Sequence, residues 1–276
     1  MRKLKKYIHI MKTLIKIAFK ILIFFVSWIT ISVLIPIPEG ISDVWWRFIA
    51  ELVPFLAIVI LTYVFNKLEK NSLSILKFEK PIKQSLAGIL LGLIWFFIPF
   101  LLLSSLGYLE ITDKNYIDML GIWIVSAFIN TIMQEFLARG YIYRLLKKEY
   151  SIIIATIVST LLFTLMHGGA FEAGPIAVIN VITMSLLMTI ILEYSNSLVI
   201  PIIMHFIWNS LGGIIFETVS LADDYPHLYN IEISGNPIIS GESFKMEGSI
   251  FVFIINIIMI GITCYLYKKR EISIYK

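Results

Sequence analysis

The strongest constraint on the fold is a succession of apolar stretches separated by short polar segments. A helix needs about 20 apolar residues to cross the hydrocarbon core of a membrane, and eight stretches of the chain reach or approach that length. They cover approximately residues 17–35, 52–65, 86–106, 119–146, 152–166, 175–192, 198–216 and 250–267. The sequence therefore predicts an all-α polytopic membrane protein with about eight transmembrane helices.

The composition excludes a soluble domain of this size. Only 15% of the 276 residues are charged, against about 25% in soluble domains, and the mean hydropathy is +0.87. The single cysteine, Cys264, excludes a disulfide framework and a cysteine-rich zinc site. Any metal must therefore be bound by His, Glu, Asp or Asn.

The distribution of charge predicts the orientation in the membrane, because cytoplasmic segments are enriched in Lys and Arg. With both termini cytoplasmic, all but four of the 23 basic residues fall in the tails or the inner connections, and most acidic residues fall in the outer ones. The exceptions are Arg47, Lys114, Arg139 and Lys245. The basic N-terminal segment leads into the first stretch without a small-residue cleavage site, which favours a retained span over a cleaved signal peptide. Next to such a span, basic residues indicate topology rather than nucleic-acid binding.

The positions of the polar residues divide the chain into four segments. Residues 1–118 hold a cytoplasmic tail and three spans, and residues 119–217 hold the polar residues discussed below. Residues 218–249 form an acidic outer loop with turn signals but no recognisable module, and residues 250–276 hold the last span and a basic tail. No convincing internal repeat is present, which counts against transporters built from duplicated halves.

Ionisable residues inside membrane helices are costly and are therefore candidates for function. Gln134, Glu135 and Arg139 lie in the fourth apolar stretch, and the i, i+4 spacing of Glu135 and Arg139 predicts that these two side chains pair. Such a pair can serve catalysis, but it can also do no more than neutralise two buried charges.

Two further polar motifs follow. His167 comes four residues after Phe163 and directly before two glycines, so it is either part of a site or a loop histidine at the membrane interface. His205 and Asn209 share one helix face and can hold a water, a metal or an oxyanion, or serve as packing contacts between helices.

A hairpin argument predicts the depths of these residues. If the chain turns near Glu149, a rise of 1.5 Å per residue places Glu135 about 21 Å and His167 about 27 Å from the turn, so that they can meet. His205 lies only about eight residues after the turn at 194–197, by the same count. We therefore expect His205 to be shallower than Glu135, unless that turn dips into the membrane.

A Glu, two His and an Asn that converge in a dry pocket can supply a general base, a partner that orients it and donors for an oxyanion, which is what a hydrolase needs. Glu135, His167 and His205 can equally bind zinc with one position open for water. The spacing does not decide between the two sites.

The three motifs resemble the CAAX protease and bacteriocin-processing family, also called the CPBP or Abi family, of intramembrane endopeptidases. The family pattern is Glu-Glu-x-x-x-Arg, then Phe-x-x-x-His, then His-x-x-x-Asn or Asp. Here the three stretches read QEFLAR at 134–139, FTLMH at 163–167 and HFIWN at 205–209. The resemblance extends over residues 119–216 and implies an eight-helix CAAX-protease-like bundle that hydrolyses a peptide bond of a membrane-associated peptide or protein.

The resemblance also implies roles for the residues of the site. The first Glu and the first His of the pattern activate water, and the second His and the Asn stabilise the oxyanion, with or without a metal. Because Gln134 replaces the first Glu and cannot accept a proton at neutral pH, we expect Glu135 to be the base. Gln134 and His167 then orient the water, His205 and Asn209 form the oxyanion site, and Arg139 anchors Glu135.

Two alternatives remain open. Gln134 also favours a non-catalytic membrane protein that binds a peptide, such as a bacteriocin-immunity or sensor factor. A proton-coupled transporter explains the buried ionisable groups but not the order of the motifs. The Ile- and Lys-rich composition and the bacteriocin-linked relatives favour a bacterial cell membrane.

Overall fold

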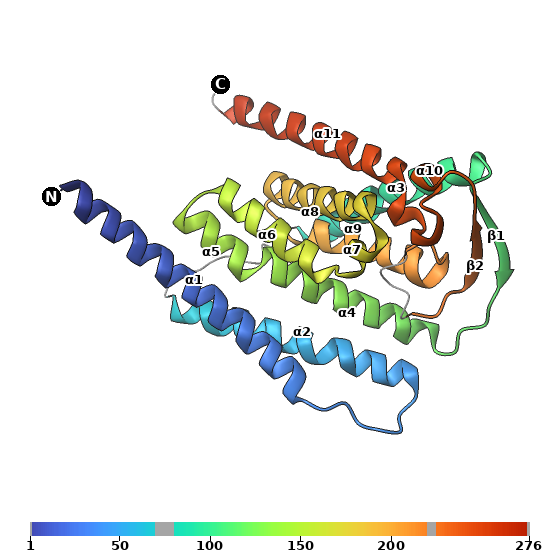
Figure 1. The fold of residues 1–276 in the computed structure, drawn as a ribbon, viewed down its shortest axis with the longest axis horizontal. Helices are drawn as coiled ribbons and strands as arrows, with labels where there is room; N and C mark the ends of the chain where they lie inside the picture. Colours follow the sequence, from blue (N-terminus) through green and yellow to red (C-terminus); the bar gives the residue numbers. More distant parts are fainter. Residues whose placement is uncertain (1, 70–79, 220–224, 275–276) are drawn as a thin grey trace.

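All eight apolar stretches are helical in the computed structural model, which describes residues 2–69, 80–219 and 225–274 (Figure 1). The first four give α1 (Arg2–Leu34), α2 (Asp43–Leu68), α3 (Pro81–Ser105), and α4 (Leu120–Arg139) followed by α5 (Tyr141–Glu149). The others give α6 (Ile152–Met166), α8 (Pro175–Ser195), α9 (Val199–Asn209) with the π-helix η1 (Ser210–Ile215), and α11 (Ile250–Ile274).

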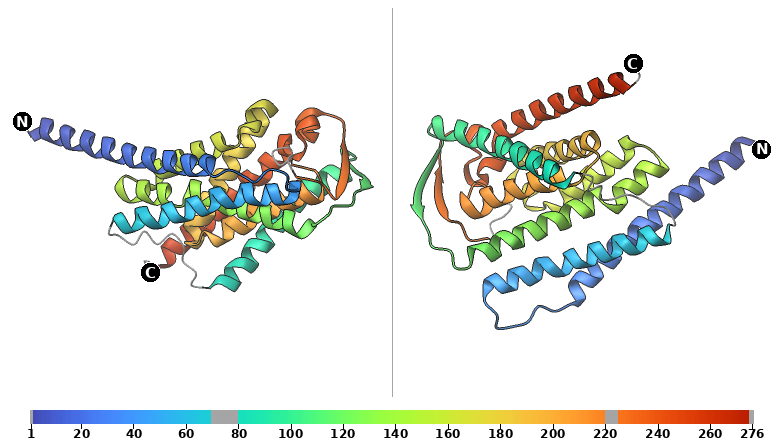
Figure 2. Two further views of the ribbon diagram at one scale, coloured as in Figure 1. Left: turned by 90° about the horizontal axis from the view of Figure 1, so that it is seen from below. Right: turned by 180° about the vertical axis from the view of Figure 1, so that it is seen from behind.

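The all-α polytopic membrane architecture is confirmed. Among the described residues, six helices are long and apolar enough to cross a membrane. The fifth and seventh stretches form the shorter apolar helices Ile152–Met166 and Val199–Ile215. The number of eight spans therefore stays a prediction. Both chain ends lie at the end of the bundle opposite the small sheet (Figures 1 and 2), and their cytoplasmic location stays a prediction as well.

The fourth stretch is not one continuous helix, as the apolar run suggested, but two helices separated at Gly140. A Cβ atom at this position would lie 2.2 Å from the carbonyl oxygen of Phe136, so a side chain would collide with the preceding turn. The break separates α4, which carries the polar motif, from the amphipathic α5, whose last turn contains Lys147 and Lys148.

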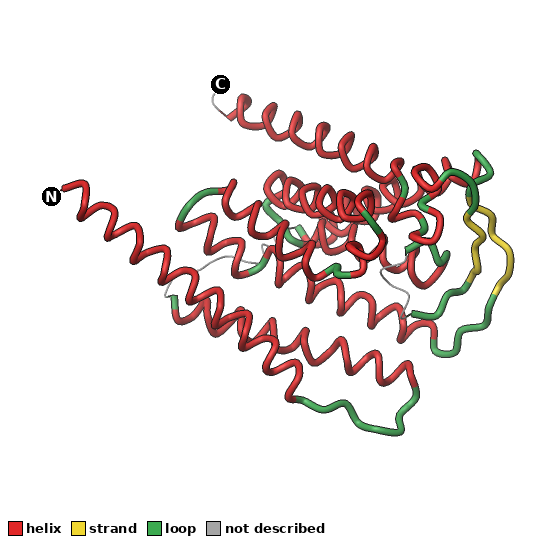
Figure 3. The backbone as a smooth tube through the Cα atoms, in the orientation of Figure 1, coloured by secondary structure: helices red, strands yellow, loops and turns green. Residues whose placement is uncertain are grey.

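The outer loop contains structure that the sequence analysis did not predict. Strand β2 (Tyr229–Ile233) pairs antiparallel with β1 (Leu109–Lys114), and Ile111 lies opposite Ile231 (Figure 3). The loop also contains the short helices α10 (Pro237–Ser240), η3 (Glu242–Phe244) and η4 (Met246–Gly248). The strands join the α3–α4 connection to the segment before α11, so that these two connections, which the sequence predicts to lie outside, cover the same end of the bundle.

The helices pack around α4 and α9. Helix α2 packs along α4, α3 packs along α9, α6 packs against α5 and α8, and α8 also contacts α11. Two glycines let α3 approach α9 closely. A Cβ atom at Gly88 would lie 2.7 Å from Cβ of Ile203, and one at Gly92 would lie 3.1 Å from Cα of Met204. This close contact fixes the depth and rotation of α9, which carries the second histidine motif.

We expect the substitution Gly92→Val to destabilise the protein by about 1–3 kcal/mol, because the added atoms overpack the α3–α9 interface. The matched control is Gly261→Val in α11, where an added Cβ meets no atom within 4 Å. Thermal unfolding in detergent gives the melting temperature of both variants. Because both place valine in a helix interior, the effect of valine on helix stability is common to the two and cancels in the comparison. Equal melting temperatures for the two would contradict close packing at Gly92.

Candidate active site

Helix α4 carries a fully buried ion pair. Arg139 Nη1 donates to both carboxylate oxygens of Glu135, at 3.0 Å to Oε1 and 2.9 Å to Oε2, and both side chains are 0% exposed. The i, i+4 spacing had predicted this contact. Since neither charge reaches solvent, each depends on the other and on the surrounding hydrogen bonds for compensation.

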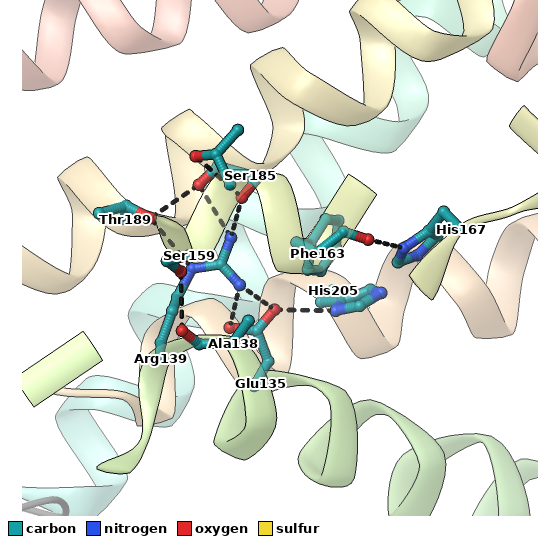
Figure 4. A network of polar contacts seen from close by, with 10 residues as sticks. Glu135, Ala138, Arg139, Ser159, Phe163, His167, Ser185, Thr189 and His205 are labelled. Carbon is teal, nitrogen blue, oxygen red and sulfur yellow. Dashed lines mark hydrogen bonds and ion pairs between the residues drawn. The ribbon is translucent and has the colours of Figure 1, made fainter. Parts of the chain in front are cut away.

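The remaining donors of Arg139 bind helix α8 (Figure 4). Nη2 donates to the backbone oxygen of Ser185 at 2.8 Å and to its Oγ at 2.9 Å, and Nε donates to Thr189 Oγ1 at 3.2 Å. The guanidinium also lies 4.9 Å from the ring centroid of Phe163. The sequence analysis missed Ser185 and Thr189, although their i, i+4 spacing in an apolar helix was an available signal.

His205 reaches the same carboxylate from α9, with its Nδ1 3.0 Å from Glu135 Oε1. This contact places His205 level with Glu135, although the turn before it is only partly buried: Ser197 and Leu198 are 0% exposed, whereas Asn196 is exposed. Since a carboxylate accepts hydrogen bonds, Nδ1 of His205 carries a proton. Its Nε2 is buried and has no hydrogen-bond partner among the described residues.

His167 follows the last residue of α6, and its Nδ1 lies 2.8 Å from the backbone oxygen of Phe163. A carbonyl can only accept, so His167 carries its proton on Nδ1 when neutral, which leaves the lone pair of Nε2 free. The imidazole stacks on the ring of Phe163, and its centroid is 6.2 Å from that of His205. Figure 4 shows both imidazoles on the same side of the ion pair.

A cavity of about 380 Å³ lies beside these residues. Gln134, His167 and Asn209 line it, whereas Glu135 and His205 are not among its wall residues. The rest of the wall mixes charged, polar and apolar side chains: Arg47, Ala127, Asn130, Met166, Gly168, Gly169, Glu172, Ala173, Val181, Met184, Trp208, Tyr225, Phe244 and Glu247. The sequence-predicted residues thus fall into two groups, a buried pair with its histidine and a set that faces the cavity.

A second polar network, which the sequence analysis did not identify, supports Gln134. Gln134 Nε2 donates to Asn130 Oδ1 at 2.7 Å, and Asn130 Nδ2 donates to Glu51 Oε2 on α2 at 2.6 Å. Arg47 Nε lies 2.8 Å from Glu51 Oε1, and the Tyr225 hydroxyl donates to the same oxygen at 3.3 Å. Burial and the neighbouring Glu51 carboxylate raise the pKa of Tyr225, so its hydroxyl stays a donor.

The donor set does not fit the zinc site that the sequence left open. Both oxygens of Glu135 already accept from Arg139 or His205, and His205 uses Nδ1 for that contact. Among the described residues, no group of three or more His, Cys, Asp or Glu side chains has the arrangement of a metal site. We therefore derive no step that passes through a metal.

Comparison with known families identifies the region that carries the site. Residues 116–211 match the family model described as type II CAAX prenyl endopeptidase Rce1-like. The match spans α4 to α9 and contains all three polar motifs, which confirms the resemblance to CAAX proteases. No curated protein and no solved structure gives a significant match to the chain.

We expect Arg139→Met to destabilise the protein by about 3–5 kcal/mol, because it leaves the Glu135 carboxylate buried without its counter-ion. The control Arg270→Met removes an arginine at the exposed end of α11, whose Nη1 donates to the backbone oxygen of Tyr194. Thermal unfolding in detergent compares the two. The double variant Glu135→Gln/Arg139→Met removes both charges and should recover part of the loss, and an Arg139→Met loss no larger than that of the control would contradict a buried ion pair.

Proposed function

We propose, from the membership of residues 116–211 in the Rce1-like family of CAAX endopeptidases, that this integral membrane protein hydrolyses a peptide bond of a membrane-associated peptide or protein. The observation that carries the proposal is the convergence of Gln134, His167 and Asn209 on one cavity inside an apolar bundle. In such surroundings polar groups that face a cavity are typical of a binding or catalytic site.

Two residues of the cavity wall, His167 and Gln134, each have one acceptor without a protein partner among the described residues, and we assign both acceptors to one water molecule. His167 offers the Nε2 lone pair, because its Nδ1 proton is held by Phe163 O. Gln134 offers Oε1, because its amide nitrogen is held by Asn130, and Oε1 is buried with no partner among the described residues. A water that donates one hydrogen to each acceptor keeps a lone pair for attack on a peptide carbonyl.

The reaction then follows with one proton shuttle. The water oxygen bonds to the carbonyl carbon while His167 Nε2 takes a water proton. The negative charge moves to the carbonyl oxygen, where the Asn209 amide on the cavity wall is the available donor. His167 returns the proton to the amide nitrogen as the C–N bond breaks, which leaves a carboxylic acid and an amine.

Glu135 takes a different role in this proposal from the one that the sequence suggested. The prediction that Glu135 is the base has not been tested, but its oxygens are occupied by Arg139 and His205 and it does not line the cavity. We propose that Glu135 positions His205 through its contact with Nδ1, while His167 is the base. Arg139 and Phe163 hold this arrangement in place.

One observation favours a second function, peptide binding without cleavage, as in an immunity or sensor protein. Gln134 occupies the cavity wall at the position where the family pattern has a glutamate. An amide orients a water but cannot accept its proton. The binding alternative therefore depends on whether His167 alone suffices as the base.

Cleavage of a library of lipid-tethered peptides by the purified protein in nanodiscs tests the proposal. We expect the wild type to cleave, His167→Ala to lose at least about a hundredfold in kcat because the general base is gone, and Gln134→Met to lose about tenfold because one hydrogen bond to the water is gone. The control is His227→Ala, which changes a histidine of the outer loop that contacts the backbone oxygen of Gly213 and should leave kcat unchanged.

Three outcomes separate the alternatives. Cleavage that survives His167→Ala but stops with Glu135→Gln would replace His167 by Glu135 as the base. A wild type that binds peptides without cutting them, together with a Gln134→Glu variant that cuts, would establish the binding function. A wild type that neither binds nor cuts any peptide would contradict the proposal and its alternative.

A further inference from the structure

We infer that Glu51 is a positioning residue of the site, because it fixes which end of the Gln134 amide is left without a partner. The inference rests on the proposed function for its consequence, but the geometry behind it is independent of activity. Glu51 is only 5% exposed, although it lies within a helix that is long and apolar enough to span a membrane. A carboxylate at such a place is costly and needs a reason.

The two oxygens of the Glu51 carboxylate have different partners. Oε1 faces Arg47 and the hydroxyl of Tyr225, and Oε2 faces Asn130. Arg47 can only donate, and Asn130 Nδ2 and the Tyr225 hydroxyl both donate to the carboxylate. Every one of these groups thus presents a donor to Glu51.

Asn130 carries the effect of Glu51 to Gln134, because the orientation of one amide determines that of the next. Asn130 must turn its NH₂ group to Glu51, so its Oδ1 faces the other way, where Gln134 Nε2 donates to it at 2.7 Å. The NH₂ group of Gln134 is thereby held at Asn130, and its Oε1 is the end left without a partner among the described residues. A carboxylate on α2 thus decides that the end of the Gln134 amide left without a partner is an acceptor, which is the group that the attacking water requires.

The substitution Glu51→Gln tests the inference because it changes the polarity and keeps the shape. The new NH₂ group is repelled by Arg47 and therefore turns to Asn130. Asn130 then has to present Oδ1 to it and NH₂ to Gln134, and Gln134 has to turn its own NH₂ group into the cavity. The whole chain of amides is inverted, and a donor replaces the acceptor at the water site.

The activity test uses this inversion in two backgrounds. With Gln134 present, we expect Glu51→Gln to lower kcat by about tenfold with little change in KM, because the water loses one acceptor. With Gln134→Glu, the inverted Asn130 donates to the new carboxylate instead of opposing it with Oδ1, so Glu51→Gln should leave kcat unchanged or raise it. A merely structural role for Glu51 would lower activity equally in both backgrounds, and that result would overturn the inference.

A second readout does not depend on activity. The chain has two glutamines, Gln84 and Gln134, so glutamine labelled with the heavy nitrogen isotope gives two side-chain NH₂ signals in the wild type, and the Glu51→Gln variant adds a third signal from position 51. We expect Glu51→Gln to speed hydrogen exchange of the Gln134 NH₂ group by about tenfold or more as it turns from Asn130 to the cavity, while the Gln84 signal stays unchanged. An unchanged Gln134 signal would overturn the inference even if the protein cleaves peptides. The predicted change in a protein without activity would sustain the orientation by Glu51 and refute only the proposed function.

The matched control is Glu69→Gln, which neutralises the carboxylate that follows α2 and accepts from Lys20 and Tyr141, and it should alter neither readout. If Glu51→Gln fails to fold, Asn130→Leu interrupts the same chain and leaves the Arg47–Glu51 pair intact. It should speed the exchange of the Gln134 NH₂ group in the same way, and protection as in the wild type would overturn the inference.

Discussion

The structure of the site depends on one buried ion pair. Glu135 and Arg139 lie on one face of α4 with no exposure to solvent, and charges at that depth persist only where every donor and acceptor is satisfied. Arg139 extends the requirement to α8 through Ser185 and Thr189, and Glu135 extends it to α9 through His205. These contacts hold three helices, α4, α8 and α9, in one register. A purely apolar interface between membrane helices specifies the register less well, because it contains no directional contacts.

The polar groups at this depth form two sets with different surroundings. The ionised pair lies behind the cavity wall, and neutral side chains with fixed orientation face the cavity, because Phe163 O holds one end of His167 and Asn130 holds one end of Gln134. Each of these side chains has one hydrogen-bonding atom committed to the protein and one left over. Such preorganisation lowers the reorganisation that a bound water or carbonyl would otherwise require.

The sequence predicted the helices and one contact of the candidate site from local signals. Hydropathy alone located the helical stretches, and the i, i+4 spacing predicted the contact of Glu135 with Arg139. The sequence left the depth of His205 dependent on the preceding turn, and its contact with Glu135 joins α9 to α4, which no local pattern encodes. The β1–β2 pairing joins segments more than a hundred residues apart, and the contact of Asn130 with Glu51 joins two helices, so both were out of reach of a local reading.

In the proposed reaction, His167 activates water at the cavity wall, and Glu135 positions His205 without touching the water. An experimental structure with a phosphinate peptide analogue bound tests this most directly, since the two phosphinate oxygens take the places of the attacking water and the oxyanion. We predict one oxygen within hydrogen-bond distance of His167 and the other at Asn209, with the Glu135–Arg139 pair intact. A phosphinate oxygen in direct contact with Glu135, with that pair broken, would contradict the proposed reaction.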